Sequence, residues 1–349
     1  MIDIIFNNIF PFLIILTILV FVHELGHYLV AIYNGVKVET FSIGFGKELF
    51  GFTDKSGTRW KFSLIPLGGY VKMHGDLDES SSKVDDSDKI NKEKSFHNKT
   101  ISQRSMILFA GPAANFIFSF VLLVFMNVFY GISKDKPIIS EVVERTSAYD
   151  VGLQSGDIII EIDDNKIKRF SELKQYIEVK DNQSVKILYS RDGKVQSINV
   201  DVIDKKIGVK GEITFEKLNF FNSCIHSVSQ LFEFTKMTIV GIYEIITGTR
   251  NTDELGGPIR IAELSGDFWS KGLQSTLWFM MVISLNLGLI NLFPIPMLDG
   301  GHLVLNFFEF VNRGPLKKEF LEIAHTFGFV LLISLMVFAT YNDIARFFE

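Results

Sequence analysis

The chain contains little cysteine and no large excess of charge of either sign. Its single cysteine, Cys224, cannot form an internal disulfide, so packing alone must hold any part that faces an oxidising compartment. The formal net charge is −5, and basic and acidic residues are interspersed along the chain. We therefore expect neither redox chemistry nor the basic surface by which proteins bind nucleic acid.

Apolar residues, in contrast, are abundant. They make up 47% of the 349 residues and include 34 phenylalanines, which is unusual for soluble domains. A helix needs about 20 apolar residues to cross the hydrocarbon core of a bilayer. The sequence predicts a mainly α-helical, multi-pass membrane protein with four transmembrane helices, within residues 1–35, 105–132, 272–300 and 320–342.

The positions of Lys and Arg predict how these helices are oriented. Both residue types concentrate in the loops after the first and third helices, which is typical of loops that stay in the cytoplasm. With four spans, both termini and the long segment between the second and third helices then lie on the extracytoplasmic side. The first helix lacks the basic leader and small-residue cleavage site of a secretory signal, so we expect it to be retained.

Two features are expected between the first two helices. Residues 36–75 alternate apolar and polar side chains around a turn signal at 54–57, which predicts a membrane-associated region of short β-hairpins on the cytoplasmic side. Residues 76–104 form a cytoplasmic loop. Its serine- and acid-rich part, 76–94, has too few apolar residues to offset the entropy of ordering, so we expect this loop to be partly disordered.

The segment between the second and third helices is predicted to contain one small soluble domain and one surface helix. Residues 136–206 contain short strand-like runs, turns and a helical stretch. Within them, residues 148–159 (A-Y-D-V-G-L-Q-S-G-D-I-I) resemble the signature of PDZ domains in the permuted form of bacterial proteases. Residues 216–250 are apolar but interrupted by charges, which favours an amphipathic helix at the membrane interface. A fifth span remains the alternative for that segment.

The strongest chemical signal is the sequence H-E-L-G-H at residues 23–27, inside the first helix. On a helix His23 and His27 lie on one face and can bind the same Zn²⁺, and Glu24 lies within reach of a water molecule at that ion. The alternative without a metal is that these polar side chains form hydrogen bonds with neighbouring helices. Each ionisable group in a membrane helix costs about 2.5–3.5 kcal/mol on insertion scales, so three in one turn require a compensating partner. The membrane setting therefore favours a metal site.

A catalytic zinc site usually has three protein ligands and one open position. We expect Asp299 to be the third ligand, because it is the one carboxylate near the end of the third helix, after the helix breakers Pro294 and Pro296. Two alternatives stay open. Asp299 could instead cap the next helix, and His302 could be a ligand, although its position favours facing the interface or orienting Asp299.

Taken together, these motifs resemble the site-2 protease family. H-E-L-G-H in the first helix, G-P-A-A-N at 111–115, a PDZ-like insertion and N-L-F-P-I-P-M-L-D-G-G-H at 291–302 occur in that family's order. The chain is similar to the bacterial regulator-of-sigma-E protease branch, with a single PDZ-like domain where the best-known members have two. The resemblance implies a protein of the bacterial inner membrane with its active site near the cytoplasmic side.

The resemblance also implies roles for individual residues. His23, His27 and Asp299 would bind zinc, and Glu24 would be the general base. An extended substrate could add as a strand to the hairpin region in the segment from Phe62 to Tyr70, for which a purely structural role is the alternative. Three asparagines are candidates for contacts to substrate or transition state, with hydrogen bonding between packed helices as an equal alternative: Asn115, Asn286 and Asn291.

These expectations predict a zinc-dependent intramembrane endoprotease in which Glu24 takes a proton from water activated by the metal. The expected partners are the lipid bilayer, membrane-spanning substrates such as a trimmed anti-sigma factor or remnant signal peptides, and an upstream protease that acts on the same substrate. A membrane metal transporter and a non-catalytic scaffold that binds metal and peptide are the alternatives, and neither needs a base such as Glu24. The PDZ-like domain is expected to exclude bulky substrates, with capture of peptide tails as the alternative.

Overall fold

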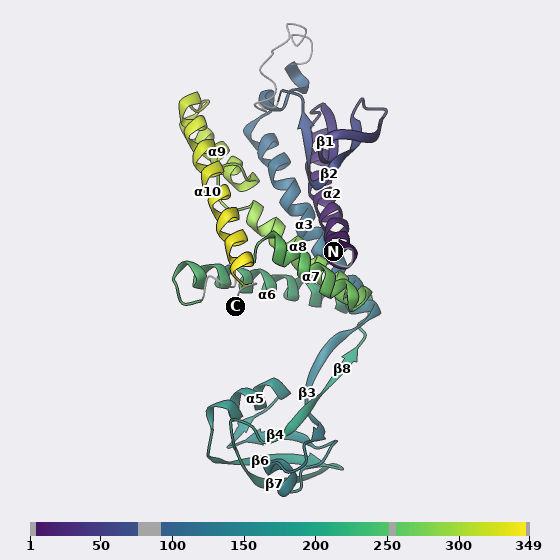
Figure 1. The fold of residues 1–349 in the computed structure, drawn as a ribbon, viewed down its shortest axis with the longest axis vertical. Coiled ribbons are helices and arrows are strands. Elements are labelled where there is room, and N and C mark those ends of the chain that lie inside the picture. The colour runs from purple at the N-terminus through teal and green to yellow at the C-terminus, as the bar shows by residue number, and fades with distance from the viewer. Residues whose placement is uncertain (1–4, 76–91, 251–255, 347–349) are drawn as a thin grey trace. The chain divides into compact units, whose positions relative to one another are not determined.

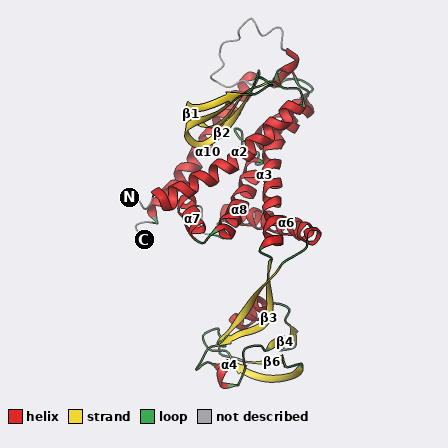
Figure 2. Cartoon of the chain, turned by 90° about the vertical axis from the view of Figure 1, so that its right-hand side faces the viewer, coloured by secondary structure: helices red, strands yellow, loops and turns green. Residues whose placement is uncertain are grey.

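The computed structural model describes residues 5–75, 92–250 and 256–346 of the chain (Figure 1). Two compact units are present, one formed by residues 1–126 and 221–349 and the other by residues 127–220. The first unit is mainly helical, and strands are the main regular structure of the second (Figure 2). Most of the segment 76–94, which was expected to be disordered, lies outside the described residues.

Four helices of the first unit have the length and composition that a membrane crossing requires. They are α2 (Phe10–Tyr33), which continues the π-helical turn η1 (Ile5–Ile9), α3 (Ile101–Phe129), α8 (Leu273–Asn291) and α10 (Lys318–Ala345). Among the described residues, only these four helices are long and apolar enough to cross a membrane, which confirms the prediction of four apolar spans. Helix α8 ends earlier than expected, because Pro294 and Pro296 follow closely and cannot continue a helix.

Shorter elements connect these helices. They are the 3₁₀ turns η3 (Lys92–Lys94) and η4 (Phe96–Asn98) and the helices α6 (Phe220–Ile246), α7 (Pro258–Ser270) and α9 (Asp299–Asn312). Helix α6 falls in the segment predicted to be amphipathic, and it exposes large apolar side chains such as Phe221, Ile225 and Phe232. Helices α7 and α9 were not predicted, because each is short and directly flanks the long apolar run of α8.

Residues 36–75 form the expected β-hairpin region, in which the two halves of each strand pair in different registers. Its strands are β1 (Val38–Thr53) and β2 (Arg59–Met73), joined at the expected turn. The first half of β1 has partners on both sides, since Phe41 pairs with both Trp60 and Val71. The segment 69–72 of β2 is therefore an edge of this sheet, with strand partners on one side only among the described residues.

Aromatic side chains hold this hairpin against helix α2. Phe41 stacks on Trp60 with ring centroids 4.2 Å apart, and Tyr28 of α2 packs edge-on against both rings. The Tyr28 hydroxyl donates a hydrogen bond to Asp54 in the turn. Burial would raise the pKa of Asp54, but hydrogen bonds from Ser56, Trp60 and other donors outweigh it and lower this pKa below its usual range. The turn thus offers a stable acceptor to the helix that carries H-E-L-G-H.

The second unit is an antiparallel sheet with two helices. Its strands lie in the order β7-β6-β4-β3-β8, and the short β5 pairs with β4. The strands are β3 (Ile132–Val142), β4 (Ile158–Ile162), β5 (Asn165–Lys166), β6 (Ser184–Arg191), β7 (Lys194–Asp201) and β8 (Val209–Glu216), and the helices are α4 (Ser147–Asp150) and α5 (Phe170–Val179). This unit is longer than the predicted domain of 136–206, because β8 pairs with β3 from Val142 and Val209 down to Ile132 and Glu216.

The interior of the second unit combines an aliphatic core with one buried ion pair. Side chains such as Ile162, Leu173 and Ile187 are fully buried in the core. The Asp157 carboxylate is also buried, and the Arg191 guanidinium donates to both of its oxygens at 2.7 Å. A carboxylate in such surroundings depends on its partner, because an unpaired buried charge is costly.

We predict that Arg191→Ala destabilises the second unit by about 3–5 kcal/mol, because it leaves the Asp157 carboxylate buried without its counter-ion. Hydrogen–deuterium exchange of β4 and β6 peptides in the full chain would measure this change. Lys210→Ala is the matched control, because it breaks the exposed ion pair with Glu141 and should cost less than about 1 kcal/mol. Equal exchange in both variants would contradict the prediction.

Candidate metal centre

Three side chains from distant parts of the first unit converge on one point. The Nε2 atoms of His23 and His27 lie 3.2 Å apart. Asp299 places Oδ2 3.2 Å from Nε2 of His23 and Oδ1 3.5 Å from Nε2 of His27. Within the described residues, no other group of three His, Cys, Asp or Glu side chains has its ligand atoms close enough to share a metal ion.

This spacing is close to that of a zinc site. Ligand atoms at about 2.0–2.1 Å from a tetrahedral centre lie roughly 3.3 Å from one another. The closest approaches observed here are 3.2, 3.2 and 3.5 Å, with each carboxylate oxygen of Asp299 facing a different histidine, and one ligand atom from each residue lies within 4.8 Å of the others. Two imidazoles and one carboxylate also form a donor set that catalytic zinc sites use, with a fourth position for water. His23, His27 and Asp299 would therefore hold the ion.

Small residues let helices α2 and α3 approach each other closely at this point. A Cβ atom on Gly26 of α2 would overlap the Ala110 carbonyl and the Ala114 side chain of α3. A Cβ atom on Gly111 of α3 would overlap both histidine rings. Close packing through small residues is common between membrane helices, and here it makes room for the two imidazoles.

Each histidine also has a partner for its second ring nitrogen. The Nδ1 atom of His27 lies 2.8 Å from the Ile107 carbonyl oxygen of α3, so it donates its proton there and leaves Nε2 free for a metal. The Nδ1 atom of His23 lies 3.1 Å from the side-chain amide of Asn115, which is also on α3. Such outer partners fix the tautomer and the ring orientation of metal-binding histidines.

The amide of Asn115 supports the same tautomer at His23. In the structure its Nδ2 faces Nδ1 of His23, while its buried Oδ1 has no hydrogen-bond partner. Rotating the amide by half a turn exchanges these two atoms, and Oδ1 then accepts the Nδ1 proton of His23. The His23 Nε2 lone pair is then free for the metal. This second orientation of the amide is the one that a metal-binding role of His23 requires.

Asp299 reaches this site from the start of α9. The chain leaves α8 after Asn291, passes Pro294 and Pro296, and enters α9 at Asp299. Leu298 occupies the N-cap position, so Asp299 does not cap the helix as the alternative supposed. Its carboxylate is instead directed at the histidines.

Contacts of α9 with neighbouring helices surround this aspartate. The ring of His302 lies against His325 of α10, with centroids 5.4 Å apart, and is not part of the ligand group. Further along α9, Glu309 pairs with Arg104 of α3 at 2.8 Å. The side-chain amide of Asn306 in α9 donates a hydrogen bond to the Ser105 hydroxyl of α3. Helix α9 is therefore connected to both α3 and α10.

Glu24 lies beside the ligand group and against the hairpin. Its carboxylate interacts electrostatically with all three predicted ligands and faces the backbone N–H of Val71 on β2. A Cβ atom on Gly69 would lie 3.3 Å from Cγ of Glu24 and 2.9 Å from Val20. The edge segment 69–72 of the hairpin therefore passes directly beside the predicted base.

The remaining predicted residues differ in their surroundings. Asn286 of α8 accepts a hydrogen bond from the Thr238 hydroxyl of α6 at 3.0 Å, which is a contact between helices. Asn291 is the half-buried last residue of α8. Tyr70 lies in the edge segment of the hairpin and stacks on Phe45.

Phe62 lies inside the hairpin sheet rather than at its edge. It pairs with Ile43 on one side and with Phe50 on the other, and its ring stacks on that of Phe50 at 4.6 Å. Its backbone is therefore already paired with strand segments on both sides. A strand added to this sheet would instead pair with one of its two edges, the segment 69–72 or the segment 48–53, and of these 69–72 is the one beside Glu24.

Three features of the site were not predicted from the sequence. The Ile107 carbonyl is a backbone group, so its residue type gives no signal. The other two features are Gly26 and Gly111, which allow the two helices to pack closely. Gly26 lies in H-E-L-G-H and Gly111 in G-P-A-A-N, and small residues in these motifs were the signal from which close helix packing could have been predicted.

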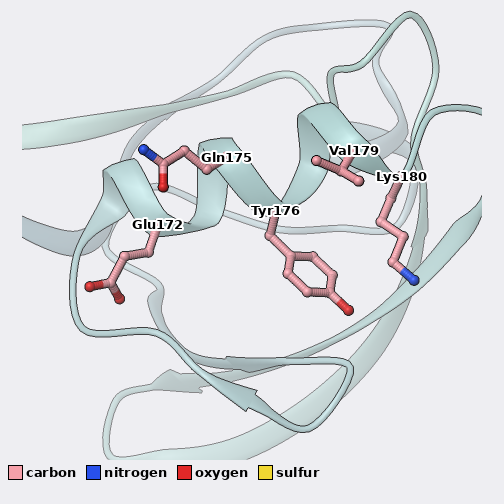
Figure 3. A pocket seen from close by; sticks show the side chains of 5 residues that line it. All are labelled: Glu172, Gln175, Tyr176, Val179 and Lys180. Carbon is pink, nitrogen blue, oxygen red and sulfur yellow. The ribbon is translucent and has the colours of Figure 1, made fainter. Parts of the chain in front are cut away.

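The second unit has a hollow of a different kind. It lies along α5 and is lined by Glu172, Gln175, Tyr176, Val179 and Lys180 (Figure 3). The Lys180 ammonium group lies over the Tyr176 ring, 5.6 Å from its centroid. The hollow is open, and the one group of metal ligands found among the described residues lies in the first unit.

Comparisons with known proteins agree with this site. The family model described as Peptidase family M50 matches residues 11–335. A protein of Agrobacterium fabrum named as a candidate zinc metalloprotease is 36% identical over 96% of this chain and 95% of its own length. A similarly named protein of Rickettsia conorii is 35% identical over 98% of this chain and 99% of its own length. The metalloprotease MmpA of Caulobacter vibrioides is 29% identical over 96% of this chain and 94% of its own length.

Among solved structures, the PDZ domain of an SdrC-like protein from Listeria monocytogenes is similar to part of the chain. It is 31% identical, covers 24% of this chain and 90% of its own, and has a TM-score of 0.20.

We predict that Asn115→Leu weakens zinc binding roughly 10–100-fold, because His23 loses the partner of its second nitrogen. Asn115→Asp should bind zinc nearly as well as the wild type, since a carboxylate keeps the acceptor. Zinc affinity measured by competition with a chelator distinguishes the variants. Ser119→Ala is the control, because its hydroxyl donates to the backbone carbonyls of Asn115 and Met281 and contacts neither the Asn115 side-chain amide nor His23. If Asn115→Asp lost as much affinity as Asn115→Leu, the assigned tautomer would be wrong.

Proposed function

Because the chain belongs to peptidase family M50, the site-2 protease family of zinc metalloproteases, we propose that it is an intramembrane endoprotease that cleaves the transmembrane segments of membrane-anchored proteins. The observation that carries this proposal is the convergence of His23, His27 and Asp299, with Glu24 beside them, in a unit of four membrane-length helices.

The proposed chemistry is hydrolysis of an amide bond. When bound, zinc supplies Lewis acidity, which acidifies water and polarises the scissile carbonyl. Glu24 accepts the proton of the attacking water and returns it to the leaving amine. The two histidine ligands keep their positions because Ile107 and Asn115 hold their rings. This division of roles uses every ionisable group of the site.

The hairpin offers a way to present the substrate. A helical substrate hides its carbonyls in hydrogen bonds, so it must become extended before attack. An extended segment that pairs with the edge 69–72 of β2 would lie next to Glu24, because the Val71 backbone N–H faces that carboxylate and a Cβ atom on Gly69 would lie 3.3 Å from its Cγ. Main-chain pairing would bind substrates of varied sequence, with Tyr70 available to contact their side chains.

The natural substrates and topology follow from the family resemblance. We infer trimmed anti-sigma factors or remnant signal peptides as substrates, produced by an upstream protease. We place the protein in the bacterial inner membrane, with both termini and the PDZ-like domain outside the cytoplasm. The active site then lies near the cytoplasmic side, as the Lys and Arg of the neighbouring loops indicate.

A metal transporter remains the alternative function. Transport requires ligands that release the ion to a second side, whereas hydrolysis requires a base beside the water. The position of Glu24 between the ligands and the strand edge favours hydrolysis.

We predict that Glu24→Gln retains zinc but loses at least roughly 100-fold in cleavage rate, because the amide keeps the shape of the side chain and cannot take a proton. Zinc content and cleavage of a model transmembrane substrate are measured on the same purified variant. Asp299→Ala is the companion variant and should lower both zinc occupancy and activity, because two imidazoles alone hold the ion less tightly. Normal turnover by Glu24→Gln would exclude the proposed mechanism.

We also propose that the second unit excludes substrates with bulky extracytoplasmic domains. The β3–β8 ladder brings both ends of this unit together, since Ile132 pairs with Glu216 and Asp135 with Ile213. Residues 136–212 can therefore be replaced by a short Gly-Ser linker while these pairs are kept.

Deletion of this unit should make an untrimmed substrate cleavable and leave a trimmed substrate little changed. The same deletion carrying Glu24→Gln controls for cleavage by other proteases. If the deletion instead slows cleavage of the trimmed substrate and leaves the untrimmed one resistant, the unit recruits substrates and the exclusion role is wrong.

A further inference from the structure

Helix α10 has very few buried residues for a helix of its length. Of its 28 residues, only Gly328 and Asp343 are buried. Most of its large apolar side chains, such as Phe327 and Val330, are exposed in a way that suits contact with lipid. The two buried positions therefore show where this helix is attached to the rest of the first unit.

The first attachment is to the loop that leads to Asp299. A Cβ atom on Gly328 would overlap the carbonyl and the ring of Pro296, so helix and loop meet backbone to backbone. Pro296 precedes Asp299 by three residues. Any side chain larger than hydrogen at position 328 must therefore push either the helix or this loop away.

One turn earlier on α10, a second contact reaches the other side of Asp299. The His325 ring packs edge-on against His302, which follows Asp299 by three residues. Helix α10 thus touches the chain on both sides of the predicted metal ligand. Figure 1 shows α9 and α10 side by side along this part of the unit.

The second attachment anchors the far end of α10. The buried Asp343 carboxylate accepts hydrogen bonds from the backbone N–H groups of Gly257, Ile259 and Arg260 at 2.8, 3.0 and 3.1 Å, at the start of α7. These are orphan donors of a helix N-terminus, and a carboxylate is a strong acceptor for them. Helix α7 packs in turn against α2, which carries His23 and His27.

We propose that α10 is a positioning element for the metal centre, which connects the Asp299 loop to the histidine-bearing helix through α7. Gly328 is its positioning residue, and Asp343 anchors it. The inference rests on the proposed zinc site, and it assigns to the last membrane span a task beyond crossing the bilayer.

A variant at position 328 separates this role from simple anchoring. Alanine favours a helix more than glycine does, so a helix that only crosses the membrane should tolerate Gly328→Ala. A positioning role predicts that Gly328→Ala releases zinc to a chelator roughly tenfold faster than the wild type, as expected for a change in a group that orients a ligand. Val330→Ile is the matched control, because it adds one carbon to an exposed position of the same helix and should leave zinc release unchanged.

A double-mutant comparison tests whether the effect acts through Asp299. In an Asp299→Ala background, Gly328→Ala should change zinc release less than about twofold, because the positioned ligand is already gone. The absorption spectrum of the cobalt-substituted protein provides a second readout, and Gly328→Ala should shift its ligand-field bands. A purely structural role would give the same fold-change in both backgrounds, and that result would overturn the proposal.

His325→Ala provides a test that adds no bulk. It removes the ring that packs on His302, and it should accelerate zinc release in the same direction. If Gly328→Ala and His325→Ala both release zinc at the wild-type rate, α10 does not position the ligand. Failure of the zinc site itself gives a different result, because Asp299→Ala alone would then leave zinc binding unchanged.

Discussion

Ionisable groups among membrane-spanning helices must compensate one another, and the first unit is built around that constraint. A lone carboxylate or imidazole in such surroundings is costly, whereas His23, His27 and Asp299 lie within 3.2–3.5 Å of one another and can share one ion. Glycines bring α2 and α3 together at the histidines, and two prolines end α8 so that the chain can return with the aspartate. Each deviation from a simple bundle of helices occurs where it serves this convergence.

The β1–β2 hairpin packs against the same part of α2 that carries the histidines. Stacked aromatic rings and the hydrogen bond from Tyr28 to Asp54 fix the sheet to α2, and its edge at 69–72 passes beside Glu24. In the proposed mechanism, substrate pairing and proton transfer therefore take place next to each other. In a bilayer this proximity matters, because an extended segment has unpaired backbone groups that need an immediate partner.

The contacts around the metal centre are of two kinds. Those between α2 and α3 are close and continuous, with buried partners for both histidines. Those that hold the aspartate come from two helices, with Arg104 and Ser105 of α3 on α9 and Gly328 of α10 on the loop before it. The histidine pair is therefore part of one rigid helix, whereas the position of the carboxylate depends on several elements that are distant in sequence.

Local properties of the sequence determined the four apolar spans, the hairpin turn, the pairing of His23 with His27 and the order of motifs typical of the family. Each of these depends on residues that are neighbours along the chain, through helix period, run length or turn preference. The tertiary structure alone decided that Ile107 and Asn115 hold the histidines, that β8 completes the second unit, and that the sheet edge lies at 69–72 instead of Phe62. It also decided that α10 touches the chain on both sides of Asp299. These features arise from backbone groups and from pairs far apart in sequence, whose partners are selected by packing and leave no local pattern.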